Sequence, residues 1–116
     1  MHDLMFAKEI IGALNNELNS VTKGSKITAV NVSLSPLSHV KPETLAETFK
    51  ATVKGTGFEK ITLSIKVLPL GIKCRACKHS FMVDKPTTRC IKCNDSDLDI
   101  VYNKEFLVDS IQVQKV

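Results

Sequence analysis

Apolar residues recur at helical spacing in the N-terminal part of the chain. They lie three or four positions apart, at Leu4, Ala7, Ile11, Leu14 and Leu18. This spacing predicts an amphipathic helix over Asp3–Leu18 with the apolar stripe buried. Gly12 weakens the helix locally, and Asn19, Ser20 and Gly24 are residues that end a helix and begin a loop.

A strand and a second helix follow. The β-branched, alternating residues of Ile27–Leu34 predict a strand that ends before Pro36. Pro42 suits the first turn of a helix, and Gly55 and Gly57 follow its C-terminal end. The buried face of this helix is marked by apolar residues four positions apart, at Leu45, Phe49 and Val53.

The strictest alternation of apolar and polar residues in the chain covers Ile61–Val67 and predicts a fourth element, a strand. Gly71 is expected in the turn that leaves this strand. Nearer the C-terminus, Ile100–Tyr102 predicts a short strand and Phe106–Val113 a longer one. Asp109-Ser110 interrupts the alternation of the last strand, which is typical of a β-bulge.

All four cysteines of the chain belong to two Cys-x-x-Cys pairs. Cys74 and Cys77 form the first pair, and Cys90 and Cys93 form the second, with residues 78–89 between them. Two such pairs supply the four sulfur ligands of a closed tetrahedral zinc site. The spacing therefore predicts structural Zn²⁺ at these four residues. A rubredoxin-like iron site is the main alternative, and two disulfide bonds are the second.

These elements together predict an α/β fold. Two helices cover a small three-stranded sheet, and a zinc-ribbon-like module is inserted before the last strand. The expected domains are residues 1–71 plus 104–116 for the α/β part and residues 72–103 for the zinc-binding part. At this size a structural metal adds stability that a small core lacks.

Charge and composition argue against several classes of function. The formal net charge is +4, and zinc bound by four thiolates would lower it by two. With one Tyr and no Trp, the chain has no aromatic residues interleaved with basic ones, so we expect no nucleic-acid binding. We also expect no membrane span, no enzymatic activity, since no catalytic motif occurs, and a cytoplasmic location, since the N-terminus does not resemble a signal peptide.

His2 is the candidate ligand of a second metal site. A terminal amine, the next amide nitrogen and an imidazole at position 2 form a chelate that favours square-planar Ni²⁺ or Cu²⁺. This site needs the nitrogen of Met1, and Asp3 is close enough to add a side-chain oxygen or a backbone nitrogen. The alternative is a frayed terminal residue without a metal.

The other two histidines, His39 and His79, are weaker candidates. His39 lies in the loop before the second helix, where we expect a surface residue. His79 follows Cys77 by two positions. It could tune the zinc site, replace a ligand or point to solvent, and its loop context favours solvent.

The whole chain resembles the HypA family of hydrogenase nickel-incorporation proteins. The resemblance begins with Met1-His2-Asp3-Leu4 leading directly into a helix, where the family has Met-His-Glu. It continues through residues 37–45, which are similar to the family's Leu-Ser-x-Val-x-Pro-Glu-x-Leu segment. The two cysteine pairs and residues 104–107, Lys-Glu-Phe-Leu, complete it.

The resemblance implies a small nickel metallochaperone for nickel–iron hydrogenase and, in some bacteria, for urease. It implies a nickel site at Met1, His2 and the adjacent Asp3, and a zinc site at Cys74, Cys77, Cys90 and Cys93. It further implies two partners: a nucleotide-hydrolase maturation protein of the HypB type and the hydrogenase large subunit.

Several residues depart from the family pattern. Asp3 replaces Glu and is one methylene shorter, which leaves a backbone role more secure than side-chain coordination. Lys78 replaces a common Gly after the first cysteine pair, so a slightly different turn is expected there, whereas Asn94 tolerates a left-handed conformation. Ser35-Pro36 and Ile91 also differ from the residues common in the family.

Two alternative functions stay open at this stage. The first is a zinc-ribbon module that binds nucleic acid or protein, because basic residues gather around the cysteine pairs. Those residues are Arg75, Lys78, Lys85, Arg89 and Lys92, and three aspartates, Asp95, Asp97 and Asp99, offset them. The second is a thiol-redox protein that cycles without metal.

Overall fold

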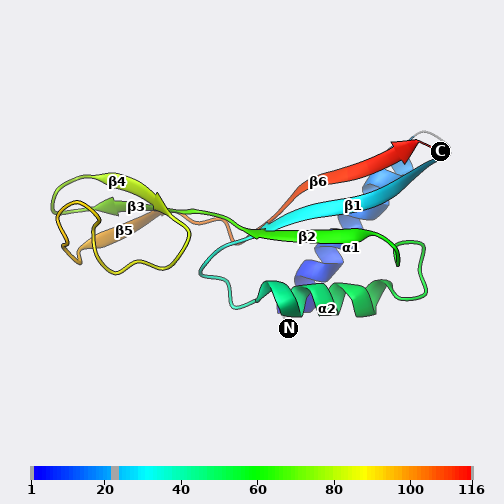
Figure 1. The fold of residues 1–116 in the computed structure, drawn as a ribbon, viewed down its shortest axis with the longest axis horizontal. Helices are drawn as coiled ribbons and strands as arrows, with labels where there is room; N and C mark the ends of the chain where they lie inside the picture. Colours follow the sequence, from blue (N-terminus) through cyan, green and yellow to red (C-terminus); the bar gives the residue numbers. More distant parts are fainter. Residues whose placement is uncertain (1, 22–23, 116) are drawn as a thin grey trace.

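The computed structural model describes residues 2–21 and 24–115. The molecule is elongated, with extents of 56 × 27 × 16 Å. Figure 1 shows two parts along this axis, an α/β part that carries both chain ends and a small β-ribbon at the opposite end. Within the described residues, no helix is long and apolar enough to cross a membrane.

Helix α1 covers His2–Ser20, close to the predicted range. Its buried face differs from the prediction. Phe6, Ala7, Ile10 and Leu14 are buried, whereas Leu4 and Leu18 are 40% and 48% exposed. The predicted stripe was therefore wrong at its ends, because the sheet and α2 contact a face rotated toward Phe6 and Ile10.

The main sheet has the strand order β2-β1-β6. β1 covers Ser25–Leu34, β2 covers Thr62–Val67 and β6 covers Phe106–Lys115, which confirms the three predicted strands. β1 runs parallel to β2 and antiparallel to β6. The parallel pairing requires a crossover, and α2 supplies it.

The predicted bulge in β6 is confirmed. Asn31 pairs with Ser110, and the next residue of β1, Val32, pairs with Val108, so Asp109 is the extra residue. The Asp109 carboxylate accepts a hydrogen bond from the buried Ser33 hydroxyl. The polar side chain that interrupts the alternation therefore has a partner on the neighbouring strand.

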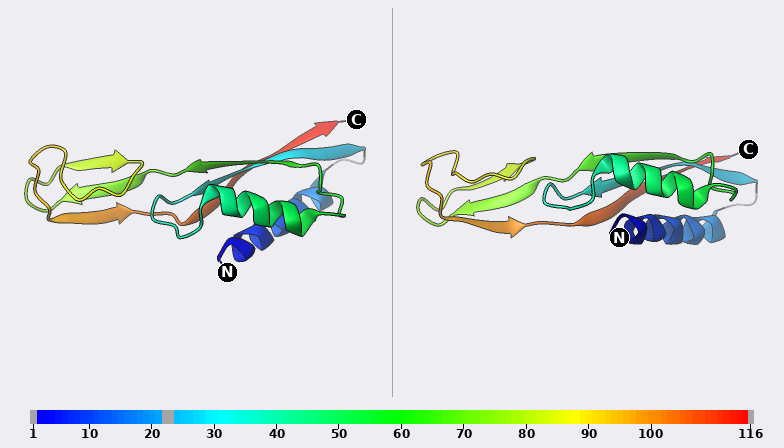
Figure 2. Two further views of the ribbon diagram at one scale, coloured as in Figure 1. Left: turned by 60° about the horizontal axis from the view of Figure 1, so that its bottom comes forward. Right: turned by 90° about the horizontal axis from the view of Figure 1, so that it is seen from below.

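Helix α2 covers Pro42–Val53 and begins with proline in its first turn, as predicted. Both helices lie on one face of the main sheet (Figure 2). The core lies between this face and the helices, and its fully buried side chains include Ile10, Leu14, Val30, Val32 and Leu45. Gly55 follows α2 with a φ of +79°, a left-handed value that favours glycine.

The inserted ribbon is a second sheet with the order β4-β3-β5. β3 covers Leu70–Cys74, β4 covers Ser80–Val83 and β5 covers Leu98–Tyr102. Gly71 lies in β3 rather than in a turn, and a Cβ there would lie 2.8 Å from the Tyr102 Cβ. Glycine is thus required by close packing across the sheet, which the sequence pattern did not reveal.

Hydrogen bonds and one aromatic pair fix the segments that lead into and out of the ribbon. The Leu68 N–H donates to the Leu34 carbonyl over 2.7 Å, and the Ser35 N–H donates to the Glu105 carbonyl over 3.0 Å. Phe106, the first residue after the returning segment, stacks on Phe6 of α1 with ring centroids 4.5 Å apart. The segments that enter and leave the ribbon are therefore fastened to the end of β1 and to α1.

Candidate metal centre

The two cysteine pairs form turns with the same hydrogen-bond pattern. The Lys78 N–H donates to the Cys74 carbonyl over 2.9 Å, and the Asn94 N–H donates to the Cys90 carbonyl over 3.0 Å. Lys78 and Asn94 both have left-handed backbones, with φ of +66° and +62°. Lys78 thus adopts the conformation that glycine or asparagine takes more readily.

The four sulfurs converge on one point. All four Sγ atoms lie within 4.8 Å of one another. Two pairs are closer, with Cys74 and Cys93 Sγ atoms 3.6 Å apart and those of Cys77 and Cys90 3.7 Å apart. In a tetrahedral site with Zn–S bonds of about 2.3 Å, the sulfurs lie roughly 3.8 Å apart. The cluster therefore fits a tetrahedral metal ion, and all four cysteines are free thiols.

The surroundings of the thiols favour binding of a cation. Backbone N–H groups donate to the cluster, from Cys77 to the Cys74 Sγ over 3.5 Å and from Lys92 to the Cys90 Sγ over 3.3 Å. The pKa of Cys90 falls to about 7, chiefly through the backbone N–H of Cys93. At Cys93 the backbone N–H of Asp95 lowers the pKa, but desolvation and the neighbouring thiols outweigh it and raise the pKa to about 12. A bound cation would replace protons that these crowded thiols otherwise retain.

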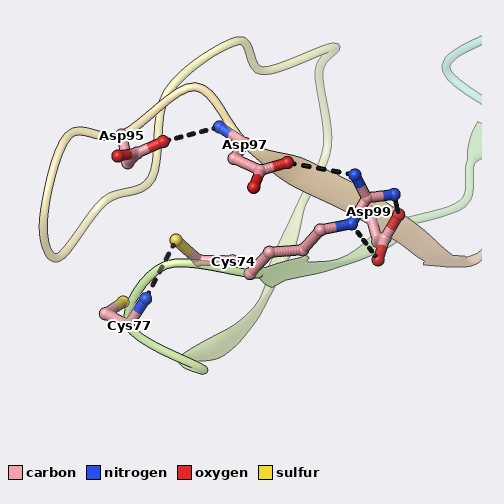
Figure 3. Close-up of polar contacts among 6 residues, drawn as sticks. Cys74, Cys77, Asp95, Asp97 and Asp99 are labelled. Carbon is pink, nitrogen blue, oxygen red and sulfur yellow. Dashed lines mark hydrogen bonds and ion pairs between the residues drawn. The ribbon is translucent and has the colours of Figure 1, made fainter.

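An arginine between the first two cysteines connects the cluster to β5. The Arg75 Nε donates to Asp99 Oδ2 over 2.8 Å, and its Nη1 donates to Asp97 Oδ1 over 3.0 Å. Figure 3 shows the carboxylates of Asp97 and Asp99 beside the turn that carries Cys74 and Cys77. The pairing raises the pKa of Arg75 and lowers the pKa of Asp99, in both cases chiefly through their mutual hydrogen bonds.

Sequence reasoning noted these charges only as offsetting one another. It missed the specific ion pairs, although a usable signal was present. Asp97 and Asp99 are two positions apart at the start of a strand, so their side chains lie on one face, where a single guanidinium reaches both.

The candidate nickel ligands lie elsewhere in the molecule. His2 is the exposed first residue of α1, and Met1 lies outside the described residues. Figure 1 shows the start of α1 beside α2, well separated from the tip of the ribbon where β3 ends at Cys74. The structure thus brings the four cysteines together and leaves His2 at a distance from them.

Asp3 is held by the second helix. The Thr48 hydroxyl donates to Asp3 Oδ2 over 2.7 Å. This bond is the main reason that the pKa of Asp3 falls to about 2. The carboxylate predicted as a possible metal ligand already has a structural partner on α2.

The two other histidines differ from each other. His39 is exposed in the loop between β1 and α2, as predicted. His79 is half-buried, its ring stacks on Phe81 at a centroid distance of 5.9 Å, and its carbonyl accepts the Cys74 N–H over 2.9 Å. The His79 ring is therefore only partly exposed to solvent, because it packs on Phe81 of β4. Neither histidine belongs to the ligand cluster found among the described residues.

Comparison with known proteins identifies relatives along the whole chain. The family described as "Hydrogenase/urease nickel incorporation, metallochaperone, hypA" matches residues 1–113. A hydrogenase maturation factor HypA of Desulfitobacterium hafniense is 31% identical over 90 residues, covering 78% of this chain and 79% of the relative. The HypA of Nostoc sp. is 28% identical over 116 residues, covering 100% of this chain and 98% of the relative.

Solved structures share the fold. The solution structure of the Ni metallochaperone HypA from Helicobacter pylori matches with a TM-score of 0.60 at 18% identity, over 98% of both chains. A second solution structure of a HypA protein matches with a TM-score of 0.63 at 18% identity, over 98% of this chain and 97% of the other. Because the family match spans both the N-terminal segment and the four-sulfur cluster, this chain belongs to the HypA family of hydrogenase/urease nickel-incorporation metallochaperones.

Proposed function

We propose that this protein binds Ni²⁺ at its N-terminus and delivers it during maturation of nickel–iron hydrogenase, while Zn²⁺ at the ribbon has a structural role. The observation that carries the proposal is the family match over residues 1–113, which includes both the N-terminal segment and the cysteine pairs. The two metals have separate places in the molecule and separate duties. No catalytic step is assigned to the protein.

The zinc proposal rests on the donor set. Four thiols with sulfur separations of 3.6 and 3.7 Å in the closest pairs suit a tetrahedral, closed site, and no position is left for substrate or water. Zn²⁺ would link Cys74 and Cys77 to Cys90 and Cys93 and so hold the ribbon together. We keep as a proposal the division into an α/β domain, residues 1–71 plus 104–116, and a zinc domain, residues 72–103, with a boundary that falls inside β3.

Nickel is the cargo, and its proposed ligands are donors of Met1, His2 and Asp3. The His2 side chain is exposed, which suits a metal that must be taken up and released. Because Asp3 Oδ2 accepts the Thr48 hydroxyl and so ties this side chain to α2, we assign to Asp3 a backbone contribution rather than side-chain coordination. Nickel binding requires deprotonated nitrogen donors, so nickel affinity falls as the solution is acidified.

The proposed partners follow from the family. They are a nucleotide-hydrolase maturation protein of the HypB type and the hydrogenase large subunit, with urease maturation as an additional role to test. We place the protein in the cytoplasm. Arg75 is paired with Asp97 and Asp99, so the basic residues of the ribbon offer less free charge to nucleic acid than their number indicates.

The test uses untagged protein with the native Met1-His2 terminus. We expect about one tightly held zinc per chain, lost after Cys74→Ser, and a separate nickel site lost after His2→Ala. His39→Ala is the matched control, because His39 is also exposed but lies in the loop between β1 and α2, away from the N-terminus. Zinc without any nickel binding would refute the chaperone proposal and favour a zinc-ribbon interaction module. Salt-dependent binding to nucleic acid would then identify that module's partner.

A further inference from the structure

The side chain and the backbone of Arg75 both bond to the segment that enters β5. Its guanidinium reaches Asp99 through Nε at 2.8 Å and also through Nη2, and it reaches Asp97 through Nη1 at 3.0 Å. The backbone N–H of Arg75 donates to the Asp97 carbonyl over 2.9 Å. One residue of the first cysteine turn is thus fixed at four points.

The same acidic segment also holds the second cysteine turn. The Asp95 carbonyl accepts the Cys90 N–H over 2.8 Å, and the Asp95 carboxylate accepts the Asp97 N–H over 2.8 Å. Figure 3 shows Asp95 and Asp97 joined in this way, with Asp99 next along β5. Residues 95–99 therefore connect the two cysteine turns by a route that includes no sulfur. We call Arg75, Asp97 and Asp99 the Arg75 clamp.

Besides the backbone pairing of β3 with β5, in which Cys74 lies opposite Leu98, little apolar packing holds the two cysteine turns together. Of the ribbon's apolar side chains, those of Leu70, Ile72, Cys74 and Cys90 are buried, and the first two lie at the base of the ribbon. The segment between β4 and β5 contains no helix or strand. An exposed ion pair contributes little by itself, but a two-pronged arginine–carboxylate contact with a second carboxylate restricts geometry far more. Here it acts where hydrophobic packing is sparse.

We propose that the Arg75 clamp is a positioning device that keeps the two cysteine turns together and slows the escape of the metal held by the four thiols. The inference rests on the proposed zinc site. A metal with four sulfur ligands leaves in steps, and one turn must swing away from the other before the last bonds break. The clamp opposes that motion. It allows the resident metal to stay bound while an exposed N-terminal cargo site exchanges freely.

The experiment measures zinc release to the chromogenic chelator 4-(2-pyridylazo)resorcinol from full-length, zinc-loaded protein. Arg75→Gln should release zinc roughly fivefold to tenfold faster, because a bidentate charged contact is replaced by at most a neutral one. Arg89→Gln is the matched control, since Arg89 also neighbours a cysteine pair but makes a single long contact, 3.4 Å to the Asn94 carbonyl. It should release zinc at the wild-type rate.

A double-mutant cycle separates the clamp from a general loss of stability. Asp99→Asn should also speed release, and adding it to Arg75→Gln should have little further effect because both remove one contact. The double variant Arg75→Asp with Asp99→Arg exchanges the two charges and should partly restore the slow release of zinc. The cobalt(II) absorption of each variant should keep its tetrahedral thiolate form, and amide exchange of β1 should not change.

The outcomes distinguish the two proposals. Zinc that is bound but released at equal rates from wild type, Arg75→Gln and Arg89→Gln would overturn the clamp and leave the zinc site intact. Multiplicative effects of Arg75→Gln and Asp99→Asn on the zinc-release rate would also overturn the clamp, since they would show that the two residues act separately. Absence of any metal at the four cysteines would overturn the zinc site and the clamp together.

Discussion

The Thr48 hydroxyl donates a hydrogen bond of 2.7 Å to the Asp3 carboxylate and so joins the first turn of α1 to α2. This bond fixes the helix start that carries the proposed nickel ligands. Asp3 thus contributes to the folded structure independently of any metal.

Replacing Thr48 with Val should lower stability in a pH-dependent manner. The pKa of Asp3 is about 2 in the folded protein and 3.8 ordinarily, so the stabilisation is present above pH 3.8 and is lost as the pH falls toward 2. Thr48→Val should therefore lower the thermal midpoint by a few degrees near neutral pH. The difference from wild type should shrink below pH 4. Circular dichroism across this pH range measures it.

Thr52→Val is the control for this experiment. The Thr52 hydroxyl bonds to the Thr48 carbonyl within α2 and has no contact with α1. Its replacement should shift the midpoint little and equally at all pH values. A Thr48→Val protein with the same pH profile as wild type would show that the bond to Asp3 does not stabilise the fold.

The corrected helix face predicts which apolar residues of α1 matter. Ile10 is fully buried, whereas Leu18, a member of the predicted stripe, is 48% exposed. Ile10→Ala should cost about 2–4 kcal/mol of unfolding free energy, and Leu18→Ala less than about 1 kcal/mol. Urea denaturation followed by circular dichroism tests this. A larger cost at Leu18 than at Ile10 would support the face predicted from spacing.

The same residues show why sequence patterns located the helix but not its face. Ile10 and Ile11 are both apolar, so spacing alone allows stripes rotated by about 100°. Only packing against Val30 and Val32 of β1 and against α2 selects Ile10. The buried face of β1 could be predicted from the sequence. A strand has only two faces, and the face that carries the apolar residues must pack against the helices.

The cysteine cluster was predictable because the Cys-x-x-Cys spacing is typical of a local turn that presents two metal ligands. Cys74 and Cys77 belong to one turn, and two such turns can meet around one metal. The ion pairs of Arg75 are not local, since they join residues more than twenty positions apart, and alternating charges fit many arrangements. Gly71 was misassigned for the same reason, because its requirement comes from Tyr102 on another strand.

Lys78 offers a route to a more stable ribbon. Its backbone is left-handed, with a φ of +66°, and a side chain with a Cβ pays a steric cost there. Lys78→Gly should raise the unfolding free energy of the zinc-loaded protein by about 0.5–1 kcal/mol, after the greater flexibility of glycine in the unfolded chain is subtracted. Asn94→Gly should raise the unfolding free energy by a smaller amount, because asparagine tolerates this conformation. Destabilisation by Lys78→Gly would mean that the lysine side chain makes a compensating contact.

Removing the metal should affect the two parts of the molecule unequally. The α/β part has a core of buried side chains from both helices and the main sheet, whereas the described hydrophobic core includes no residue of the ribbon. Chelation should therefore increase amide exchange in β3 and β5 by at least about tenfold, with little change in β1. Hydrogen exchange read by NMR or mass spectrometry at Ile72 and Val32 measures both parts at once. Equal acceleration at the two residues would contradict this, because it would mean that the metal stabilises the α/β core as well as the ribbon.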